Sequence, residues 1–525
     1  MAGLLAALVV IFGLLVNHGV AGGSDSYGYV SQAELWLHGD LHLSQPQARK
    51  VPWPFAQWTL SPLGYRPSVD LGSIVPVYAP GLPIMMAAMK RVAGQPAVAW
   101  LIPMFGGLLV AMTFLIGRRI FSSDVGAAGA FLVTTSPALL FMLSQQMSDV
   151  PVAGCWAVAT YGCLLNSRKG DFVAGLSAGV AILVRPNLAH VAVLMAVWLL
   201  VREVRAGRLP FQPWRFALFA VPVATAGIGV ALLYRDLYGS ATTSGYGPVD
   251  VIYTSSSALP NLRRYGWWLM QSQTPLALAG VLALFIPARI LKQPPPAGGR
   301  GLLALVCVAA VTGYLFWNVF DAWWYLRFLL PAWPAICLTT AWLLTWPSGR
   351  VFSRPALAAL VGVGLYCVWF AYRGSAFDLG EGDRRYATAA RLVRSATPPN
   401  SIIISTQHSG SVRYYGGRMS LRYDWLSERW LDRSVEWLSA HGVHPFILLD
   451  EGEVPEFKRR FAGLNTLGHL NVATVWEYRG ASRVILFDPL QRARPGEALV
   501  IITPADVKIP FYPEPAPPPE FVLKD

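Results

Sequence analysis

Long apolar runs recur along the first 372 residues and are separated by short polar connections. A run of about 20 apolar residues is long enough to cross a bilayer as a helix. We therefore predict an all-α polytopic membrane bundle of about 11 transmembrane helices over residues 1–372. The predicted spans are Leu4–Val16, Ala97–Ile116, Val125–Leu143, Val150–Leu165, two short helices within 172–208, Phe216–Tyr234, Trp267–Pro287, Leu302–Phe320, Phe328–Trp346 and Ala356–Tyr372.

The two short helices are expected to meet at Arg185-Pro186, because proline disfavours a helical conformation in the residue before it. The segment 77–94 is apolar but is interrupted by prolines and a glycine. It is too short to cross the membrane comfortably, so we predict that it lies at the interface or re-enters.

A long loop over residues 22–75 follows the first span, and its first part has the period of a helix. One apolar face is formed by Tyr29, Ala33, Trp36 and Leu37. The helix begins at Ser24 or Asp25 and ends at Gly39. We expect it to lie flat at the membrane surface with its apolar face down, so that Asp25 points across the mouth of the bundle.

The pattern changes after Tyr372, where short apolar runs alternate with helical stretches. The runs SIIIST, PFILLD and RVILFD are rich in β-branched residues and are bounded by turn signals. Such alternation predicts a small C-terminal α/β domain with a parallel core over residues 373–490. Residues 491–525 are proline-rich and are predicted to form an extended tail.

The composition agrees with a membrane protein, since 54% of residues are hydrophobic and only 14% are charged. The formal charge of +13 would suggest nucleic acid as a partner of a soluble protein. Here the basic residues fall largely into short loops between spans, which topology and anionic lipid explain, and into the C-terminal region. We predict no nucleic-acid partner. The basic loops should face the cytoplasm of a bacterial cell (inner) membrane, which leaves the 22–75 loop and the C-terminal domain extracytoplasmic.

The order and spacing of several motifs resemble the GT-C superfamily of integral-membrane glycosyltransferases. The likeness is strongest to the protein O-mannosyltransferase and aminoarabinose-transferase type, that is, family 39. The motifs, within about residues 1–350, are GGSDSYGYVSQAELWLHGDL, YAPGLPIMMA, FLVTTSPALLFMLSQQMSDVPVAGCWAVATYGCLL, AGLSAGVAILVRPN and YLRFLLPAWPA.

The resemblance implies a glycosyltransferase that moves a sugar from a polyprenyl-phosphate donor to an extracytoplasmic hydroxyl. In such relatives the acidic residue of the first loop is the catalytic base, which here is Asp25. An acidic residue at the position of Asp149 contacts donor or acceptor, or assists a metal. Transfer in one displacement would invert the anomeric configuration. The partners implied are the lipid-linked donor, a glycan, lipid or protein acceptor, and membrane lipid.

Arg185 and Arg327 are the candidate ligands of the donor phosphate. A guanidinium inside a membrane segment costs about 2.5–3.5 kcal/mol on insertion scales and therefore usually faces a cavity or a partner. Arginine also fits phosphate oxygens in a bidentate way. Aminoarabinose-transferase relatives carry a phosphate-contacting lysine shortly before the YAPGLP motif. This chain has the motif but not the lysine, and Arg66 is the candidate substitute.

Each candidate also has a purely structural interpretation. Asp25 could cap its helix and Asp149 could begin one. The two membrane arginines could snorkel or pair with Asp321. Arg66 could be an ordinary loop cation.

The spacing of His18, His38 and His42 fits no standard metal cage, so we assign no metal ligand and no definite cofactor, and a divalent metal stays open. A transporter or flippase for a lipid-linked saccharide is the main alternative, because broken helices also occur in transporters. A structural protein that docks an envelope partner is a third possibility.

Overall fold

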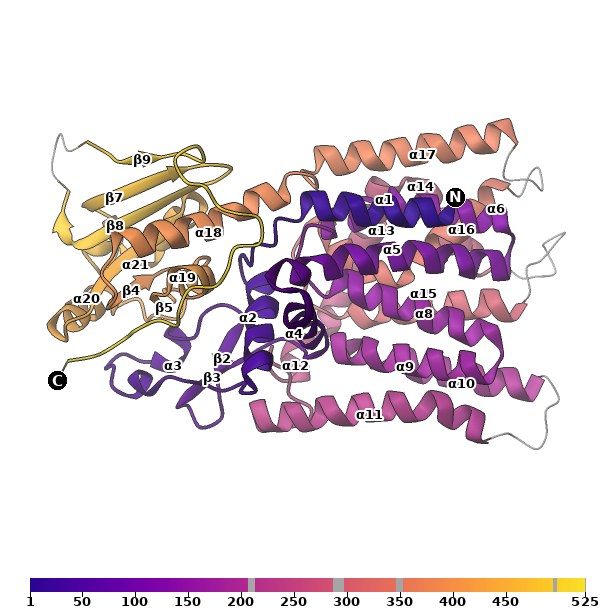
Figure 1. Cartoon of the computed structure of the whole chain (residues 1–525), viewed down its shortest axis with the longest axis horizontal. Helices are drawn as coiled ribbons and strands as arrows, with labels where there is room; N and C mark the ends of the chain where they lie inside the picture. Colours follow the sequence, from indigo (N-terminus) through magenta and orange to yellow (C-terminus); the bar gives the residue numbers. More distant parts are fainter. Residues whose placement is uncertain (206–212, 287–296, 346–352, 494–497, 525) are drawn as a thin grey trace.

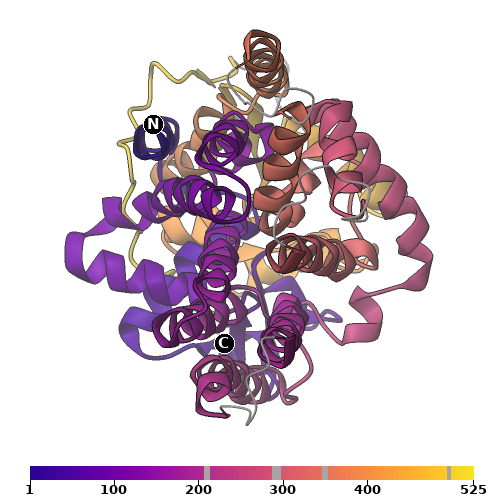
Figure 2. The same cartoon turned by 90° about the vertical axis from the view of Figure 1, so that its right-hand side faces the viewer.

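The computed structural model describes residues 1–205, 213–286, 297–345, 353–493 and 498–524. A helical bundle and a sheet-containing C-terminal part lie end to end along the long axis of the molecule (Figure 1). The bundle helices run roughly along this axis, and a view from the far end of the bundle shows most of them end-on (Figure 2).

Six described helical segments are long and apolar enough to cross a membrane. They are α5 (Gln95–Ile120), Pro186–Arg205, which includes α10 (Ala189–Arg205), α11 (Pro213–Tyr238), Gly298–Leu315 within α15 (Ala297–Leu315), Trp323–Thr345, and α17 (Arg354–Arg373). Three shorter apolar helices accompany them, namely α1 (Ala2–Val16), α6 (Ser123–Thr134) and α8 (Asp149–Leu165). The structure therefore confirms a mostly helical bundle of membrane character, but it does not confirm the count of about 11 spans.

Proline accounts for breaks that the predicted spans did not include. The predicted span Val125–Leu143 is divided into α6 and α7 (Pro137–Met142), because Ser136 before the proline is extended. The predicted span Trp267–Pro287 is likewise divided into α13 (Ala258–Gln273) and α14 (Pro275–Ala283). A 3₁₀ segment, η5 (Trp323–Ala332), precedes α16 (Trp333–Thr345).

The predicted break at Arg185-Pro186 is confirmed. Helix α9 (Arg168–Val184) ends there, and α10 begins after the short 3₁₀ turn η2 (Pro186–Leu188). The backbone of Arg185 is extended rather than helical, with φ −145° and ψ 88°. The guanidinium of Arg185 is therefore carried by a non-helical residue at the end of the bundle that faces the C-terminal part (Figure 1).

Helix α2 (Asp25–His38) lies across this end of the bundle beside α4 (Gly81–Ala93) (Figure 1). The position of α2 relative to the membrane surface stays a prediction, but its first turns have no face open to solvent. Every residue from Ser26 to Ala33 is buried, because the C-terminal part covers the other side of the helix. Tyr27, for example, packs against Gly410.

The loop after α2 forms a small antiparallel sheet in the order β1-β3-β2 beside the same end of the bundle. Its strands are β1 (Leu43–Ser44), β2 (Tyr65–Pro67) and β3 (Ser73–Pro76). Between β1 and β2 lie η1 (Pro46–Arg49) and the short helix α3 (Ala56–Thr59).

The C-terminal part contains a six-stranded sheet in the order β5-β4-β6-β8-β7-β9. Strands β4 (Ser401–Ile404), β5 (Met419–Leu421) and β6 (His444–Asp450) are parallel, as the alternation of strands and helices predicted. Strand β8 (Arg483–Arg492) runs antiparallel to β6 and to β7 (Val472–Arg479), and β9 (Ile501–Ile502) completes the sheet. Its helices are α18 (Leu379–Ala396), α19 (Ser409–Gly416), α20 (Leu431–Ala440) and α21 (Val454–Phe461).

Several basic helix ends lie at the end of the bundle opposite the candidate site. Arg118 and Arg119 end α5, Arg168 begins α9, and Arg205 ends α10. All these helix ends point away from the C-terminal part (Figure 1). These helix ends are therefore separated from α2 along the long axis, whereas Lys90 of α4 lies 2.6 Å from Glu34 of α2.

Candidate active site at the mouth of the bundle

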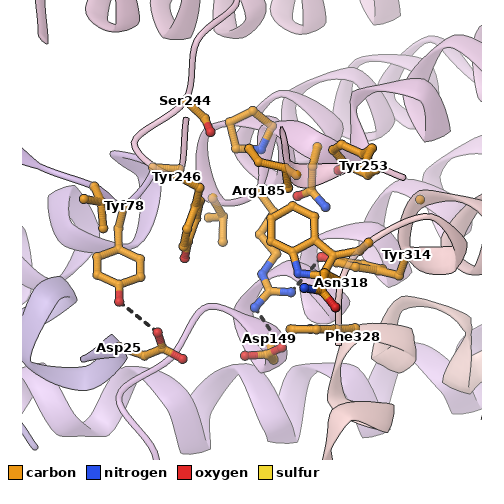
Figure 3. A pocket seen from close by; sticks show the side chains of 18 of the residues that line it. Asp25, Tyr78, Asp149, Arg185, Ser244, Tyr246, Tyr253, Tyr314, Asn318 and Phe328 are labelled. Carbon is orange, nitrogen blue, oxygen red and sulfur yellow. Dashed lines mark hydrogen bonds and ion pairs between the residues drawn. The ribbon is translucent and has the colours of Figure 1, made fainter. Parts of the chain in front are cut away.

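A cavity of about 720 Å³ opens where α2, the end of α9, the 242–253 loop and η5 come together. Its wall is mostly apolar and aromatic, with charged groups gathered on one side (Figure 3). Four of the five residues chosen from the sequence line this cavity: Asp25, Asp149, Arg185 and Arg327. Arg66 is not among the lining residues.

Asp25 is the first residue of α2, and its side chain turns toward the cavity rather than toward the helix backbone. The N-cap residue of α2 is Ser24, and the Asp25 carboxylate bonds to side chains of other segments. One carboxylate oxygen accepts a hydrogen bond from the Tyr78 hydroxyl at 2.8 Å, and the other lies 3.2 Å from Nη2 of Arg327. The side chain is 32% exposed, which leaves part of the carboxylate open to the cavity.

Tyr78 is a site residue that sequence reasoning missed, although it stands in the quoted YAPGLP motif. Its ring packs on Gly28, and its hydroxyl also meets Ser24 Oγ at 3.0 Å. Burial raises the pKa of Tyr78 well above its ordinary value of 10.0, and the nearby Asp25 raises it further. The phenol is therefore protonated at neutral pH and donates to Asp25.

Asp149 begins α8 and is almost completely buried, at 1% exposure. Nη2 of Arg185 lies 2.8 Å from its Oδ1. Neither carboxylate oxygen accepts a well-aligned hydrogen bond from the described residues. The carboxylate is thus balanced mainly by opposite charge, the condition that a buried ionised group requires.

Arg185 is held by three partners at once. Besides the Asp149 carboxylate, Nε donates to Ser148 Oγ and Nη1 donates to the Tyr314 hydroxyl, each at 2.7 Å. The Phe328 ring lies 5.2 Å from the guanidinium carbon and stacks on Tyr314. These contacts orient the guanidinium at the cavity wall (Figure 3).

Arg327 links the two carboxylates. Its Nη2 pairs with Asp25, and its Nε lies 4.0 Å from Oδ1 of Asp149. Nη1 donates to the sulfur of Met147 at 2.8 Å, and Nε has no hydrogen-bond acceptor among the described residues. Two nitrogen atoms of Arg327, Nε and Nη1, therefore have no oxygen acceptor within hydrogen-bond distance among the described residues. Asp321, the alternative partner considered from the sequence, lies near Arg264 at 3.8 Å.

Aromatic side chains from segments far apart in the chain form most of the remaining wall. They are Tyr29, Tyr234, Tyr246, Tyr253, Tyr314, Trp317, Phe320, Tyr325 and Phe328. The rings make this surface apolar, and the hydroxyl and indole N–H groups add hydrogen-bonding positions to it. The aromatic content of the 242–253 loop was a signal in the sequence that could have pointed to these residues. No local pattern, however, shows which rings line the same cavity.

Arg66 acts on that loop rather than on the cavity itself. Its Nη1 donates to the backbone carbonyls of Ser244 and Gly245, both at 3.3 Å. Its guanidinium carbon lies over the rings of Trp58 and Tyr238 at 5.6 Å and 5.5 Å. Arg66 thereby fastens the loop that carries Tyr246.

The histidines noted in the sequence do not gather around Asp25. His18 lies against Phe511 and 3.6 Å from Glu381, whereas His38 is exposed at the end of α2. Over the ranges that the structure describes, no group of three His, Cys, Asp or Glu side chains is placed to hold a metal ion.

Comparison with known proteins supports the motif resemblance over part of the chain. Residues 77–228 match the family described as dolichyl-phosphate-mannose-protein mannosyltransferase. A dolichyl-phosphooligosaccharide-protein glycotransferase of Methanococcus voltae is 29% identical over 132 residues. That match spans 24% of this chain and only 14% of the length of the relative.

Two solved structures share the fold over most of the chain. ArnT of Cupriavidus metallidurans, solved with undecaprenyl phosphate, matches with a TM-score of 0.57 and 13% identity, over 94% of this chain and 99% of ArnT. The oligosaccharyltransferase AglB of Archaeoglobus fulgidus, solved with an inhibitory peptide and a dolichol-phosphate, matches with a TM-score of 0.55 and 12% identity, over 90% of this chain and 72% of AglB. The chain therefore has the fold of the GT-C superfamily of integral-membrane glycosyltransferases, as the resemblance of its motifs predicted.

Proposed function

We propose that the protein transfers a sugar from a polyprenyl-phosphate-linked donor to an acceptor hydroxyl on the extracytoplasmic side of the membrane. One observation carries this proposal. A partly exposed carboxylate, Asp25, and two guanidinium groups, Arg185 and Arg327, converge on one side of a cavity whose other walls are apolar and aromatic.

Asp25 is the proposed general base. The acceptor oxygen attacks the anomeric carbon while its proton passes to the Asp25 carboxylate, and the bond between that carbon and the phosphate oxygen breaks. The phosphate leaves with the electron pair. Because attack and departure occur on opposite faces, one displacement inverts the anomeric configuration. Tyr78 and Arg327 each hold one carboxylate oxygen and so fix the direction in which Asp25 faces.

The arginines are proposed to stabilise the charge that develops on the leaving phosphate. Preorganised donors at the position of developing charge lower the barrier most effectively when they are already fixed. Nε and Nη1 of Arg327 have no oxygen acceptor among the described residues, which suits this side chain to phosphate oxygens. Arg185 adds positive charge beside it, and the buried Asp149 keeps both guanidinium groups in place.

The lipid part of the donor is proposed to occupy the apolar side of the cavity. ArnT was solved with undecaprenyl phosphate and AglB with a dolichol-phosphate, and both share the fold of this chain. Val249, Ile252 and Phe320 line the cavity and offer an apolar surface of the kind that an isoprenoid chain contacts. The acceptor is proposed to be a glycan, lipid or protein that presents a hydroxyl group.

The basic helix ends support the proposed membrane orientation. Arg118, Arg119, Arg168 and Arg205 lie at the end of the bundle away from Asp25. Cytoplasmic loops generally carry an excess of Lys and Arg, so that end is proposed to face the cytoplasm. The cavity and the C-terminal part then face the extracytoplasmic side of a cell (inner) membrane.

The test compares a deletion strain complemented with the wild type, with Asp25→Asn or with Asp40→Asn. Asp40 is an exposed carboxylate just beyond α2 and serves as the matched control. We expect Asp25→Asn to accumulate a polyprenyl-phosphate sugar and to lack one envelope glycan, with normal amounts of folded protein. A normal glycan profile in the Asp25→Asn strain contradicts the proposed base. Loss of lipid-linked sugar transport, with no transfer by the purified wild type, favours the flippase alternative.

A further inference from the structure

Helix α18 lies outside the cavity, yet it contacts both segments that carry the two acidic residues of the site. The chain enters α18 directly after α17, as it passes from the bundle to the C-terminal part (Figure 1). Asp383 and Tyr386 are three positions apart, so they lie on the same face of this helix. One contacts the segment before Asp149, and the other contacts the segment before Asp25.

Tyr386 packs on the backbone just before α2. A Cβ atom at Gly22 would lie 2.3 Å from the Tyr386 ring, so only glycine allows the ring to approach this closely. Gly23 has a φ of +59°, a left-handed conformation that glycine adopts without strain. A hydrogen bond also holds the same segment, because the Ala21 amide donates to the Tyr415 hydroxyl at 2.6 Å.

Asp383 holds the segment before α8. Nε2 of Gln145 donates to Oδ2 of Asp383 at 2.9 Å, and Gln145 stands four residues before Asp149. The two segments are also joined directly, because Nε2 of Gln146 donates to Oδ1 of Asn17 at 2.6 Å. The backbone segments that precede Asp25 and Asp149 are therefore both contacted by α18.

Such a support matters because both carboxylates follow non-helical segments. Asp25 and Asp149 are the first residues of α2 and α8, so their positions depend on the backbone that precedes each helix. Displacement of a reacting group by about 1 Å can reduce the rate by roughly 100-fold. A rigid helix that contacts both segments limits the movement of one carboxylate relative to the other.

We propose that α18 is a positioning element for glycosyl transfer. In this role, Asp383 and Tyr386 hold the segments that precede Asp149 and Asp25 in a fixed position relative to each other. This inference rests on the proposed function of the site. It gives the C-terminal part a role in the rate of the reaction, although no residue of that part lines the cavity among those described.

The test uses full-length protein purified in detergent and five variants. Tyr386→Ala and Asp383→Leu remove the contacts. Tyr386→Phe keeps the ring, and Asp383→Asn keeps an oxygen that accepts from Gln145. Arg394→Ala, at an exposed position of the same helix, is the control. The donor is the lipid-linked sugar isolated from cells that carry Asp25→Asn, and undecaprenyl phosphate is the binding probe.

We expect Tyr386→Ala and Asp383→Leu to lower kcat by roughly 100-fold. The KM for the donor and the affinity for undecaprenyl phosphate should change little, because neither residue lies in the cavity. The two conservative variants should restore most of the rate. Wild-type kcat in both disruptive variants overturns the inference, as does equal loss of activity in disruptive and conservative variants.

Hydrogen exchange separates failure of this inference from failure of the proposed function. We expect faster exchange of amides 22–29 in Tyr386→Ala and of amides 145–152 in Asp383→Leu, with no change in Arg394→Ala. Unchanged exchange in both disruptive variants overturns the positioning role even if the wild type transfers sugar. Faster exchange in a protein whose wild type transfers no sugar supports the contacts and contradicts the glycosyltransferase proposal.

Discussion

The guanidinium of Arg327 lies 3.2 Å from the carboxylate of Asp25, although the two residues are 302 positions apart in the chain. This pair joins η5 to the N-terminus of α2 and closes one side of the cavity. Arg327 contacts the proposed base, and we propose that it also contacts the leaving phosphate. The relationship explains why both residues should be sensitive to substitution.

Replacement of Arg327 by methionine should weaken the binding of undecaprenyl phosphate. Hydrogen bonds to charged groups contribute about 1.5–3 kcal/mol, which corresponds to roughly a 10- to 100-fold increase in Kd. Arg327→Lys should recover part of the affinity, because lysine keeps the charge but not the planar fork. Titration of the purified protein measures the effect, and Arg264→Met is the control at the same end of the bundle. An unchanged Kd in Arg327→Met contradicts the assignment.

The buried pair of Asp149 and Arg185 gives a stability prediction. Asp149→Asn and Arg185→Gln each leave a buried charge without its main partner, and such changes cost about 3–5 kcal/mol. The double variant should recover much of this loss in the free energy of unfolding, because no uncompensated charge remains. Sugar transfer should stay low in all three variants. The free energy of unfolding of the wild type, the two single variants and the double variant is measured in mixed micelles as a double-mutant cycle. Additive losses would show that the two side chains act independently.

Gly28→Ala should impair transfer through Tyr78. A Cβ atom at position 28 would lie 2.0 Å from the Tyr78 ring, so the ring must move away from Asp25. Loss of this hydrogen bond should lower kcat by about 10-fold, the equivalent of roughly 1.4 kcal/mol. Tyr78→Phe should give a similar loss, and the combined variant should lose little more. Gly362→Ala is the control, because the corresponding position in α17 has no atom within 4 Å.

The C-terminal part should lose stability at low pH through Asp450. Burial alone would raise the pKa of this carboxyl, but His408 and Arg385 lower it further than burial raises it, so the pKa is below its ordinary value of 3.8. A depressed carboxyl pKa stabilises the fold above the unfolded-state pKa and loses that contribution as the pH falls through the folded-state value.

Asp450→Asn should therefore lower the unfolding temperature of the protein at neutral pH, and the difference from the wild type should shrink below about pH 4. Thermal unfolding between pH 3 and pH 8 measures the effect. Asp40→Asn, at an exposed position, should show no such pH-dependent difference. A deficit in Asp450→Asn that is the same at every pH would contradict the ion-pair explanation.

Local chemistry explains the features that could be predicted before the structure was known. Apolar runs predicted the helical bundle because the hydrophobic period of a helix is contained in a few turns. The break at Arg185-Pro186 was predictable because proline acts on its immediate neighbour. The same rule applied to Ser136-Pro137 and Thr274-Pro275, where the long apolar runs concealed the breaks.

The amino-acid sequence alone was sufficient to select Asp25 and Asp149, through the resemblance of their motifs to a known family. It also selected Arg185 and Arg327, because charged groups within apolar segments are costly and need a partner or a cavity. It did not determine which cation meets which carboxylate, that Tyr78 donates to Asp25, or that the C-terminal part covers α2. Those relationships join residues up to several hundred positions apart, and only the packing of the folded chain brings such residues together.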